Sequence, residues 1–209
     1  MTREINRDTL PGLYQTAFTR DHTSAIGARR MHISVVRAGT LYLPSGRLVA
    51  CDPLLGKQKR PFIQTVLPGR YPVDLSLGQD TGDGIERIIF ARVLITNKAP
   101  VVWVKALDEG ADGRDASGDF GLLAKSGTIA LMDLQTSNRI QLDTLTGLDD
   151  FLDKLVGNYR PKRSWYLQTF TEDHNALFFT STVGDQPVPT YFAVDDAGDI
   201  CLALTTLLS

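Results

Sequence analysis

The segment TLYLPSGRLVACDP constrains the fold more than any other part of this chain. Two apolar runs, Leu41–Leu43 and Leu48–Cys51, flank the tripeptide Pro44-Ser45-Gly46. Proline presets φ for the first position of a turn, and glycine tolerates the positive φ that follows a type I turn. Proline also cannot donate a ladder hydrogen bond, so Asp52-Pro53 ends the second run. The segment therefore predicts two strands joined by a three-residue hairpin, with Gly46 at positive φ.

Strand-like segments fill most of the remaining sequence. Alternating or β-branched runs follow one another at hairpin spacing with turn residues between them, which favours antiparallel pairing in a meander. These runs occupy residues 31–107, a hairpin around Lys125-Ser126-Gly127, and residues 165–207. The last run, residues 202–208, is apolar on both faces, which indicates a central or covered strand. No internal repeat is evident.

Two segments have helical character. An apolar stripe predicts an amphipathic helix over about residues 147–157, with Thr146 as its cap and Gly157 as its stop. The stripe consists of Leu148, Phe151, Leu152, Leu155 and Val156. A short N-terminal helix is expected at Leu13–Phe18, followed by a loop over Thr19–Arg30.

The longer helix lies between β segments rather than outside them, which favours one α+β, β-rich domain over residues 1–209. Within it we expect an N-terminal helix and loop in residues 1–30 and a β-rich part in residues 31–133. A helical insert over residues 134–158 and C-terminal β hairpins over residues 164–209 complete the predicted organisation.

Charge and composition exclude several classes of protein. The 209 residues carry a formal net charge of -2, so no basic excess is present to neutralise a nucleic-acid backbone. No apolar run approaches the roughly 20 residues of a spanning helix, and the N-terminus lacks the apolar stretch of a signal peptide. We therefore expect a cytoplasmic protein with neither a nucleic acid nor a membrane as partner. Cys51 and Cys201 lie in apolar runs without zinc-site spacing, so we expect two buried, unpaired thiols and no metal or other cofactor.

Aspartates beside apolar runs are the strongest candidates for catalysis. Asp52, Asp133 and Asp185 each follow or adjoin such a run. If they converged, with Arg47 nearby, they could bind a metal or act as acid and base. The alternative is that each carboxylate bonds to local backbone in a turn or cap, which leaves the protein without catalytic residues.

Other polar features have simpler interpretations. His22, His32 and His174 are predicted to lie in a loop, a strand and a turn, without metal-ligand spacing. Gly78–Gly84 is similar to a phosphate or calcium loop, but it contains no P-loop lysine and no closing glutamate of a calcium loop. Gln79–Gly84 and Glu109–Asp119 are Gly/Asp-rich loops. We expect them to join strands and to offer an acidic surface to a basic protein partner.

The order of several motifs resembles a bacterial family called domain of unknown function 4241. The most specific of these motifs is Gly39–Pro53. Weaker similarities follow along residues 13–207 at Pro68–Val73, Trp103–Leu107, Gly127–Asp133, Gly184-Asp185 and Pro189-Thr190-Tyr191.

Two positions depart from the family pattern. Gln186 replaces the second glycine of a Gly-Asp-Gly hairpin, and Lys125-Ser126 stand where an acidic residue precedes Gly-Thr. These changes weaken an enzymatic interpretation. Members of such families are often encoded beside toxin genes, so the resemblance implies a non-catalytic protein-binding domain, an immunity protein that neutralises a toxin. The alternative hypothesis is a metal- or carboxylate-dependent hydrolase.

Overall fold

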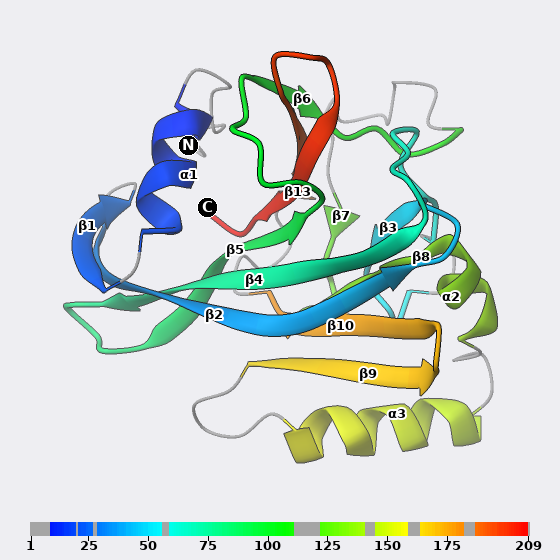
Figure 1. Cartoon of the computed structure of the whole chain (residues 1–209). Helices are drawn as coiled ribbons and strands as arrows, with labels where there is room; N and C mark the ends of the chain where they lie inside the picture. The colour runs from blue at the N-terminus through cyan, green and yellow to red at the C-terminus, as the bar shows by residue number, and fades with distance from the viewer. Residues whose placement is uncertain are drawn as a thin grey trace.

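Two antiparallel sheets packed face to face form the centre of the protein, as its computed structural model shows (Figure 1). The structure describes residues 9–19, 21–26, 29–55, 59–110, 122–140, 145–158, 164–181 and 187–208. Strands dominate these residues and helices are few, which confirms the α+β, β-rich class that the sequence predicts.

The larger sheet has seven strands in the order β1 (His22–Ile26), β2 (Arg29–Leu43), β4 (Gly69–Asp80), β5 (Glu86–Leu94), β13 (Ile200–Thr206), β12 (Thr190–Val194) and β6 (Val102–Lys105). The smaller sheet has four strands in the order β3 (Leu48–Cys51), β8 (Thr128–Asp133), β10 (His174–Thr180) and β9 (Trp165–Thr171). A separate pair is formed by β11 (Pro187–Val188) and β7 (Leu122–Leu123). The helices are α1 (Leu10–Ala17), α2 (Leu134–Arg139) and α3 (Leu145–Asn158).

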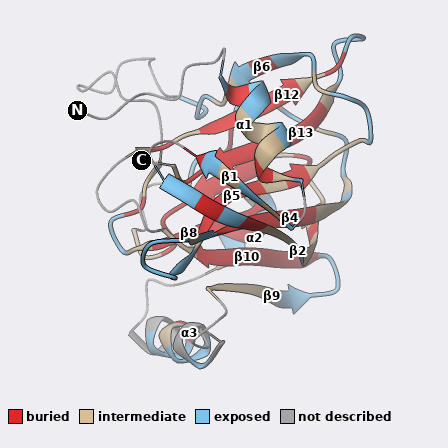
Figure 2. Ribbon diagram, turned by 90° about the vertical axis from the view of Figure 1, so that its left-hand side faces the viewer, coloured by how far each residue is buried: buried red, intermediate tan, exposed pale blue. Residues whose placement is uncertain are grey.

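The main hydrophobic core lies between the two sheets, where alternate residues of each strand meet. Leu75 of β4 and Leu131 of β8 are both buried there. The outer face of the larger sheet packs against α1, and the outer face of the smaller sheet packs against α3. The rings of Phe151 in α3 and Phe178 in β10 lie 4.9 Å apart. Figure 2 shows the buried residues concentrated in the sheets and the exposed ones at their margins.

The predicted hairpin at Pro44-Ser45-Gly46 is a corner between the two sheets. The turn itself forms as expected, because the Gly46 amide donates to the Leu43 carbonyl over 3.1 Å and Gly46 has a φ of 69°. However, β2 pairs with β1 and β4, whereas β3 pairs with β8. The hairpin pairing was therefore wrong, because a tight turn fixes the local reversal of the chain but not the strand that each arm joins.

The predicted hairpin around Lys125-Ser126-Gly127 is wrong for the same reason. β7, on one side of the turn, pairs with β11. β8, on the other side, lies between β3 and β10 in the smaller sheet. The turn again contains a glycine at positive φ, with a value of 75° at Gly127.

The expected meander holds for β2, β4 and β5, which pair in sequence order. It fails after β5, because the C-terminal hairpin of β12 and β13 inserts between β5 and β6. β13 is thus an interior strand, which confirms the prediction from its two apolar faces. The second partner of β5 is β13, from the far end of the chain, and local spacing cannot reveal such a partner.

The helix boundaries differ from the prediction by a few residues. α1 begins at Leu10, with proline in its first turn, rather than at Leu13. α3 begins at Leu145, so Thr146 lies within the helix and is not its cap. The loop predicted over Thr19–Arg30 is wrong in part, since β1 pairs there with β2. Along the described chain, no helix is long and apolar enough to cross a membrane.

Both cysteines are buried and unpaired, as the sequence predicts. Burial raises the pKa of the Cys51 thiol to about 12, and the Cys201 thiol donates to the Ala193 carbonyl over 3.2 Å. Because the thiolate is the reactive form, we expect both thiols to react slowly with a thiol reagent in the native protein and rapidly in denaturant. Mass spectrometry after timed labelling measures this, and rapid native labelling of Cys51 would contradict the packing of β3.

Candidate functional site

Asp133, a predicted site residue, fastens the corner between β2 and β3. Its side chain is fully buried at the end of β8. One carboxylate oxygen accepts the amide of Ser45 over 3.0 Å and the hydroxyl of the same residue over 2.7 Å. The other oxygen accepts the Gln135 amide over 2.7 Å, so Asp133 is also the N-cap of α2. All three hydrogen-bond donors are groups of Ser45 and Gln135, so the carboxylate holds the turn and the start of α2 in place.

Asp52 fastens the second corner, between β7 and β8. This carboxylate is also fully buried. It accepts the Ser126 amide and the Ser126 hydroxyl, each over 2.7 Å, and the Leu54 amide over 3.0 Å. The arrangement matches that of Asp133, because each aspartate receives one serine amide, one serine hydroxyl and one amide two residues further along the chain.

The two corners are copies of one short motif. Ser45–Asp52 and Ser126–Asp133 both read Ser-Gly, then five residues, then Asp. Because the two copies pair antiparallel as β3 and β8, the serine of each copy bonds to the aspartate of the other. We call this arrangement the reciprocal Ser–Asp clasp. No repeat was predicted from the sequence, although the shared Ser-Gly and the spacing to Asp were visible signals.

The clasp keeps the two carboxylates apart. Asp133 lies opposite Leu48 in the ladder, and Asp52 lies four residues beyond Leu48. At about 3.4 Å per residue, roughly 14 Å of strand separates the two side chains. A shared metal ion needs carboxylate oxygens within about 2.6 Å of it. The structure therefore does not bring Asp52 and Asp133 into one site.

Of the other two residues of the predicted set, Arg47 contributes its backbone to the first corner, where its amide donates to the Ser45 hydroxyl over 3.3 Å and its carbonyl accepts the Leu134 amide over 2.9 Å. Arg47 directs its side chain to Glu109 in an ion pair. Asp185 lies outside the described residues. Gln186, which departs from the family pattern, also lies outside them.

The histidines occupy ordered positions in the sheets. His22 lies in β1 rather than in a loop, and His32 lies in β2. His174 is buried at the start of β10 rather than in a turn, with its Nδ1 atom 3.1 Å from the Thr136 hydroxyl. In the described parts of the chain, no three His, Cys, Asp or Glu side chains come together as metal ligands.

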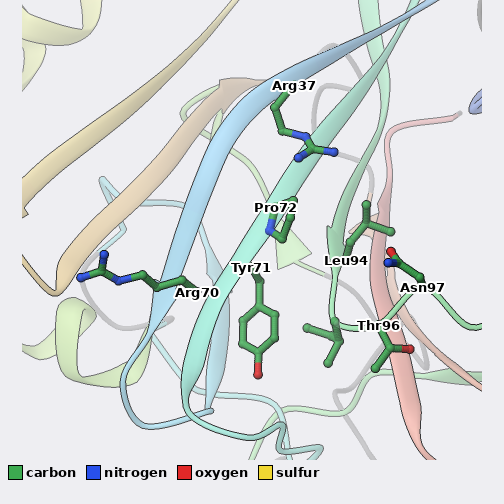
Figure 3. Close-up of a pocket in the computed structure, with 8 residues that line it drawn as sticks. Arg37, Arg70, Tyr71, Pro72, Leu94, Thr96 and Asn97 are labelled. Carbon is green, nitrogen blue, oxygen red and sulfur yellow. The ribbon is translucent and has the colours of Figure 1, made fainter.

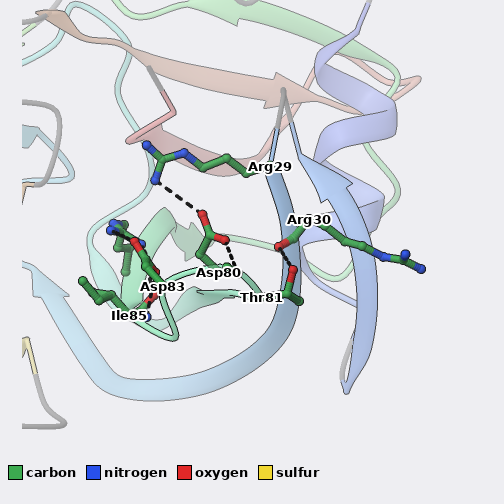
Figure 4. A network of polar contacts seen from close by, with 8 residues as sticks. Arg29, Arg30, Asp80, Thr81, Asp83 and Ile85 are labelled. Carbon is green, nitrogen blue, oxygen red and sulfur yellow. Dashed lines mark hydrogen bonds and ion pairs between the residues drawn. The ribbon is translucent and has the colours of Figure 1, made fainter.

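The loop Gln79–Gly84 does not present the acidic surface that its composition suggests (Figure 4). Asp83 forms a paired contact with Arg87, over 2.6 Å and 3.2 Å, which lowers the pKa of the Asp83 carboxyl to about 2. Asp80 faces Arg29 over 3.6 Å. Each of these two carboxylates therefore forms an ion pair with a different arginine, which offsets its negative charge. In the second loop, Glu109 pairs with Arg47, and residues 111–119 lie outside the described chain.

An apolar surface that sequence analysis did not identify lies along β6, at the edge of the larger sheet. We define the apolar edge as Ile63, Val101, Val102, Val104 and Leu107, all of which are exposed. Val101 and Val102 are 62% and 52% exposed. Ile63 is included in the apolar edge because its amide donates to the Leu107 carbonyl over 2.9 Å, which places it beside the segment that follows β6. Five of the eight large exposed apolar side chains in the described chain therefore gather at one strand.

These features define a β-rich protein of two packed antiparallel sheets whose buried aspartates fasten the crossings between them. The profile of the family described as Protein of unknown function (DUF4241) matches residues 41–205. The chain belongs to this family. Among curated proteins and solved structures, none matches the chain significantly.

Proposed function

We propose that this protein is a non-catalytic binding domain that works in the cytoplasm and contacts a partner protein through the apolar edge. The observation that carries the proposal is the exposure of alternating valines on the outermost strand of the larger sheet. Native proteins blunt the edges of their sheets with charges, prolines or bulges, because an open apolar edge invites pairing with another chain. An edge that keeps exposed valines is therefore typical of an interaction surface.

The backbone of β6 supports the same conclusion. The Ala106 amide donates to β12, and alternate residues of an antiparallel strand direct their backbone groups to the same side. Trp103 and Lys105 therefore direct theirs away from β12. The Lys105 carbonyl accepts the Gln64 side chain over 3.3 Å. By the same alternation the amide and carbonyl of Trp103 face away from β12, at the last strand of the described sheet, where an extended segment of a partner can add as a further strand.

The carboxylate-dependent hydrolase that the sequence left open lacks comparable support. It needs Asp52 and Asp133 in one cleft, whereas each of these carboxylates is fully buried and receives three hydrogen bonds from the fold. A binding domain needs no such cleft.

The finer form of the proposal is an immunity protein, whose partner is a toxin that it neutralises. Members of families of this kind are often encoded beside toxin genes, and this analogy supports the choice of partner. Its direct test is survival of cells that express the product of a neighbouring gene together with this protein or with a variant of the apolar edge.

The double variant V102K/V104K should abolish partner capture while leaving the fold intact. Exposed positions tolerate polar side chains, so we expect the free energy of unfolding to change by less than about 1 kcal/mol. Lysine would place two charges where the partner buries apolar surface, and we expect at least a tenfold loss of affinity. Affinity purification from the native host, with mass spectrometry of the captured proteins, identifies the partner and measures the loss.

The matched control is I85K, because Ile85 is 54% exposed on a different part of the surface. This variant should capture the partner as the wild type does. Partner binding should also slow hydrogen exchange at the Trp103 amide. If V102K/V104K and I85K capture the partner equally well, the apolar edge is not the binding surface.

A further inference from the structure

A pocket of about 380 Å³ lies at the larger sheet, and none of its lining residues belongs to the apolar edge. Strands β2, β4 and β5 and the residues after β5 supply its walls (Figure 3). The lining residues are Arg37, Arg70, Tyr71, Pro72, Leu94, Ile95, Thr96 and Asn97. Two of them are cationic and none is acidic, so the pocket has a positive lining.

The charge of this pocket depends on Asp74, a buried carboxylate that two arginines share. Arg92 donates to one Asp74 oxygen through Nε over 3.1 Å and through Nη2 over 2.9 Å. Its Nη1 donates to the Tyr14 hydroxyl over 2.8 Å, and its guanidinium lies 4.0 Å from the centre of the Phe18 ring. Arg92 is therefore fully engaged by Asp74 and the aromatic side chains of the N-terminal segment.

Arg37 is engaged at only one of its nitrogens. Its Nε donates to the second Asp74 oxygen, which fixes the direction of the guanidinium. In the described structure its two terminal nitrogens have no hydrogen-bond partner, and its side chain is 54% exposed. One carboxylate between two guanidinium groups leaves one positive charge uncompensated. That charge is available at Arg37, beside the pocket.

The surroundings of Arg37 are suited to an anion with an apolar body. Figure 3 shows its guanidinium directed toward the β5 side of the pocket, with Pro72 on β4 between the two strands. Leu94 gives a hydrocarbon wall. The Thr96 hydroxyl accepts the Lys98 amide over 3.3 Å, so its proton can be donated to a ligand. Asn97 adds an exposed carboxamide.

Arg70 is not part of this arrangement, although it lines the pocket. Its side chain extends in the opposite direction from the β5 residues (Figure 3). There it pairs with Asp173 over 3.2 Å and lies 4.5 Å from the centre of the Tyr42 ring. Arg37 is consequently the cation that a ligand in the pocket would meet.

We propose that this pocket binds a small organic oxyanion, a carboxylate or a phosphate ester on a compact apolar group. The free edge of the Arg37 guanidinium donates two parallel hydrogen bonds to the oxyanion, and the apolar group packs on Pro72 and Leu94. Asp74 is a positioning residue, since it orients Arg37 without contacting the ligand. This site is independent of the proposed protein-binding edge.

The test is a titration with benzoate, phenyl phosphate and the neutral analogue benzamide, followed by NMR of the backbone amides and of the arginine Nε–H groups. We expect both anions, or one of them, to shift the Arg37 and Thr96 signals saturably, and benzamide to leave them unchanged. A preference between the anions identifies the ligand as a carboxylate or a phosphate ester. Saturation by benzamide, or no saturation by either anion, would overturn the proposal.

Arg37→Gln should weaken anion binding by about tenfold or more, the factor expected for the loss of a charge-assisted hydrogen bond. Arg37→Lys keeps the charge but not the paired geometry, so it should recover only part of the affinity. The matched control is Arg29→Gln, because Arg29 has a similarly exposed side chain (55%) and pairs with Asp80 away from the pocket. Equal losses of anion affinity in Arg37→Gln and Arg29→Gln would show a general effect of charge and would rule out the proposed site.

Discussion

Gly46→Ala should lower the free energy of unfolding by about 3 kcal/mol or more, the combined cost of backbone strain and overpacking. A methyl group at this position would lie 2.0 Å from the Val66 carbonyl oxygen, far inside van der Waals contact. The Val66 amide also donates to the Gly46 carbonyl over 2.9 Å, so the two segments cannot separate without losing a hydrogen bond. Chemical denaturation of the purified variant measures the loss.

The structure supplies a matched control in the second corner. Gly127 has nearly the same φ as Gly46, at 75° against 69°, but a methyl group there meets nothing within 4 Å. Gly127→Ala should therefore cost only the strain of a left-handed residue, about 1 kcal/mol. If both variants lose the same stability, the close approach of Val66 is not what restricts Gly46 to glycine.

Asp133→Ala and Asp52→Ala should each destabilise the protein by about 3–5 kcal/mol, because each leaves three backbone or hydroxyl donors without an acceptor. Since about 14 Å of strand separates the two side chains, the losses should add to within about 0.5 kcal/mol in the double variant. Thermal or chemical denaturation of the two single variants and the double variant provides the comparison. Asp133→Asn and Asp52→Asn keep the shape of the side chain and should lose less.

The reciprocal Ser–Asp clasp makes a further comparison available for the same prediction. Ser45→Ala combined with Asp133→Ala should cost less than the sum of the two single losses, because both substitutions remove the same hydrogen bond from the Ser45 hydroxyl to Asp133. Ser126→Ala combined with Asp133→Ala should be additive, since Ser126 bonds to Asp52 instead. Stability losses below about 1 kcal/mol in both aspartate variants, with loss of a measured activity, would favour the hydrolase.

Local chemistry allowed several features to be predicted from the sequence. Pro44-Ser45-Gly46 favours a tight turn on local grounds, because proline fixes φ near the value of the first turn position and glycine tolerates a positive φ. The stripe around Phe151 has the period of a helix whatever it packs on, and the apolar faces of β13 indicate an interior strand. Each of these signals needs only neighbouring residues, so it was visible before any strand had a partner.

Features of the site that depend on distant residues could not be predicted in the same way. The apolar edge consists of valines that resemble core residues in the sequence, and only the position of β6 at the end of the sheet exposes them. The positive pocket depends on Asp74 being shared by Arg37 and Arg92, which belong to different strands. The loop Gln79–Gly84 does not offer the expected acidic surface, in part because Arg29 of β2 forms an ion pair with Asp80.

The sequence by itself determined the local elements: strands, turns and the amphipathic helix. Tertiary structure alone decided that the two predicted hairpins are corners between sheets and that Asp52 and Asp133 fasten them. A turn between two apolar runs suits a hairpin and a sheet-to-sheet crossing equally, because both bury the runs and reverse the chain. The difference lies in partners that stand 88 residues away for Asp133 and Ser45 and 74 residues away for Asp52 and Ser126. Those partners meet only when β3 and β8 pair, which is a property of the assembled sheets.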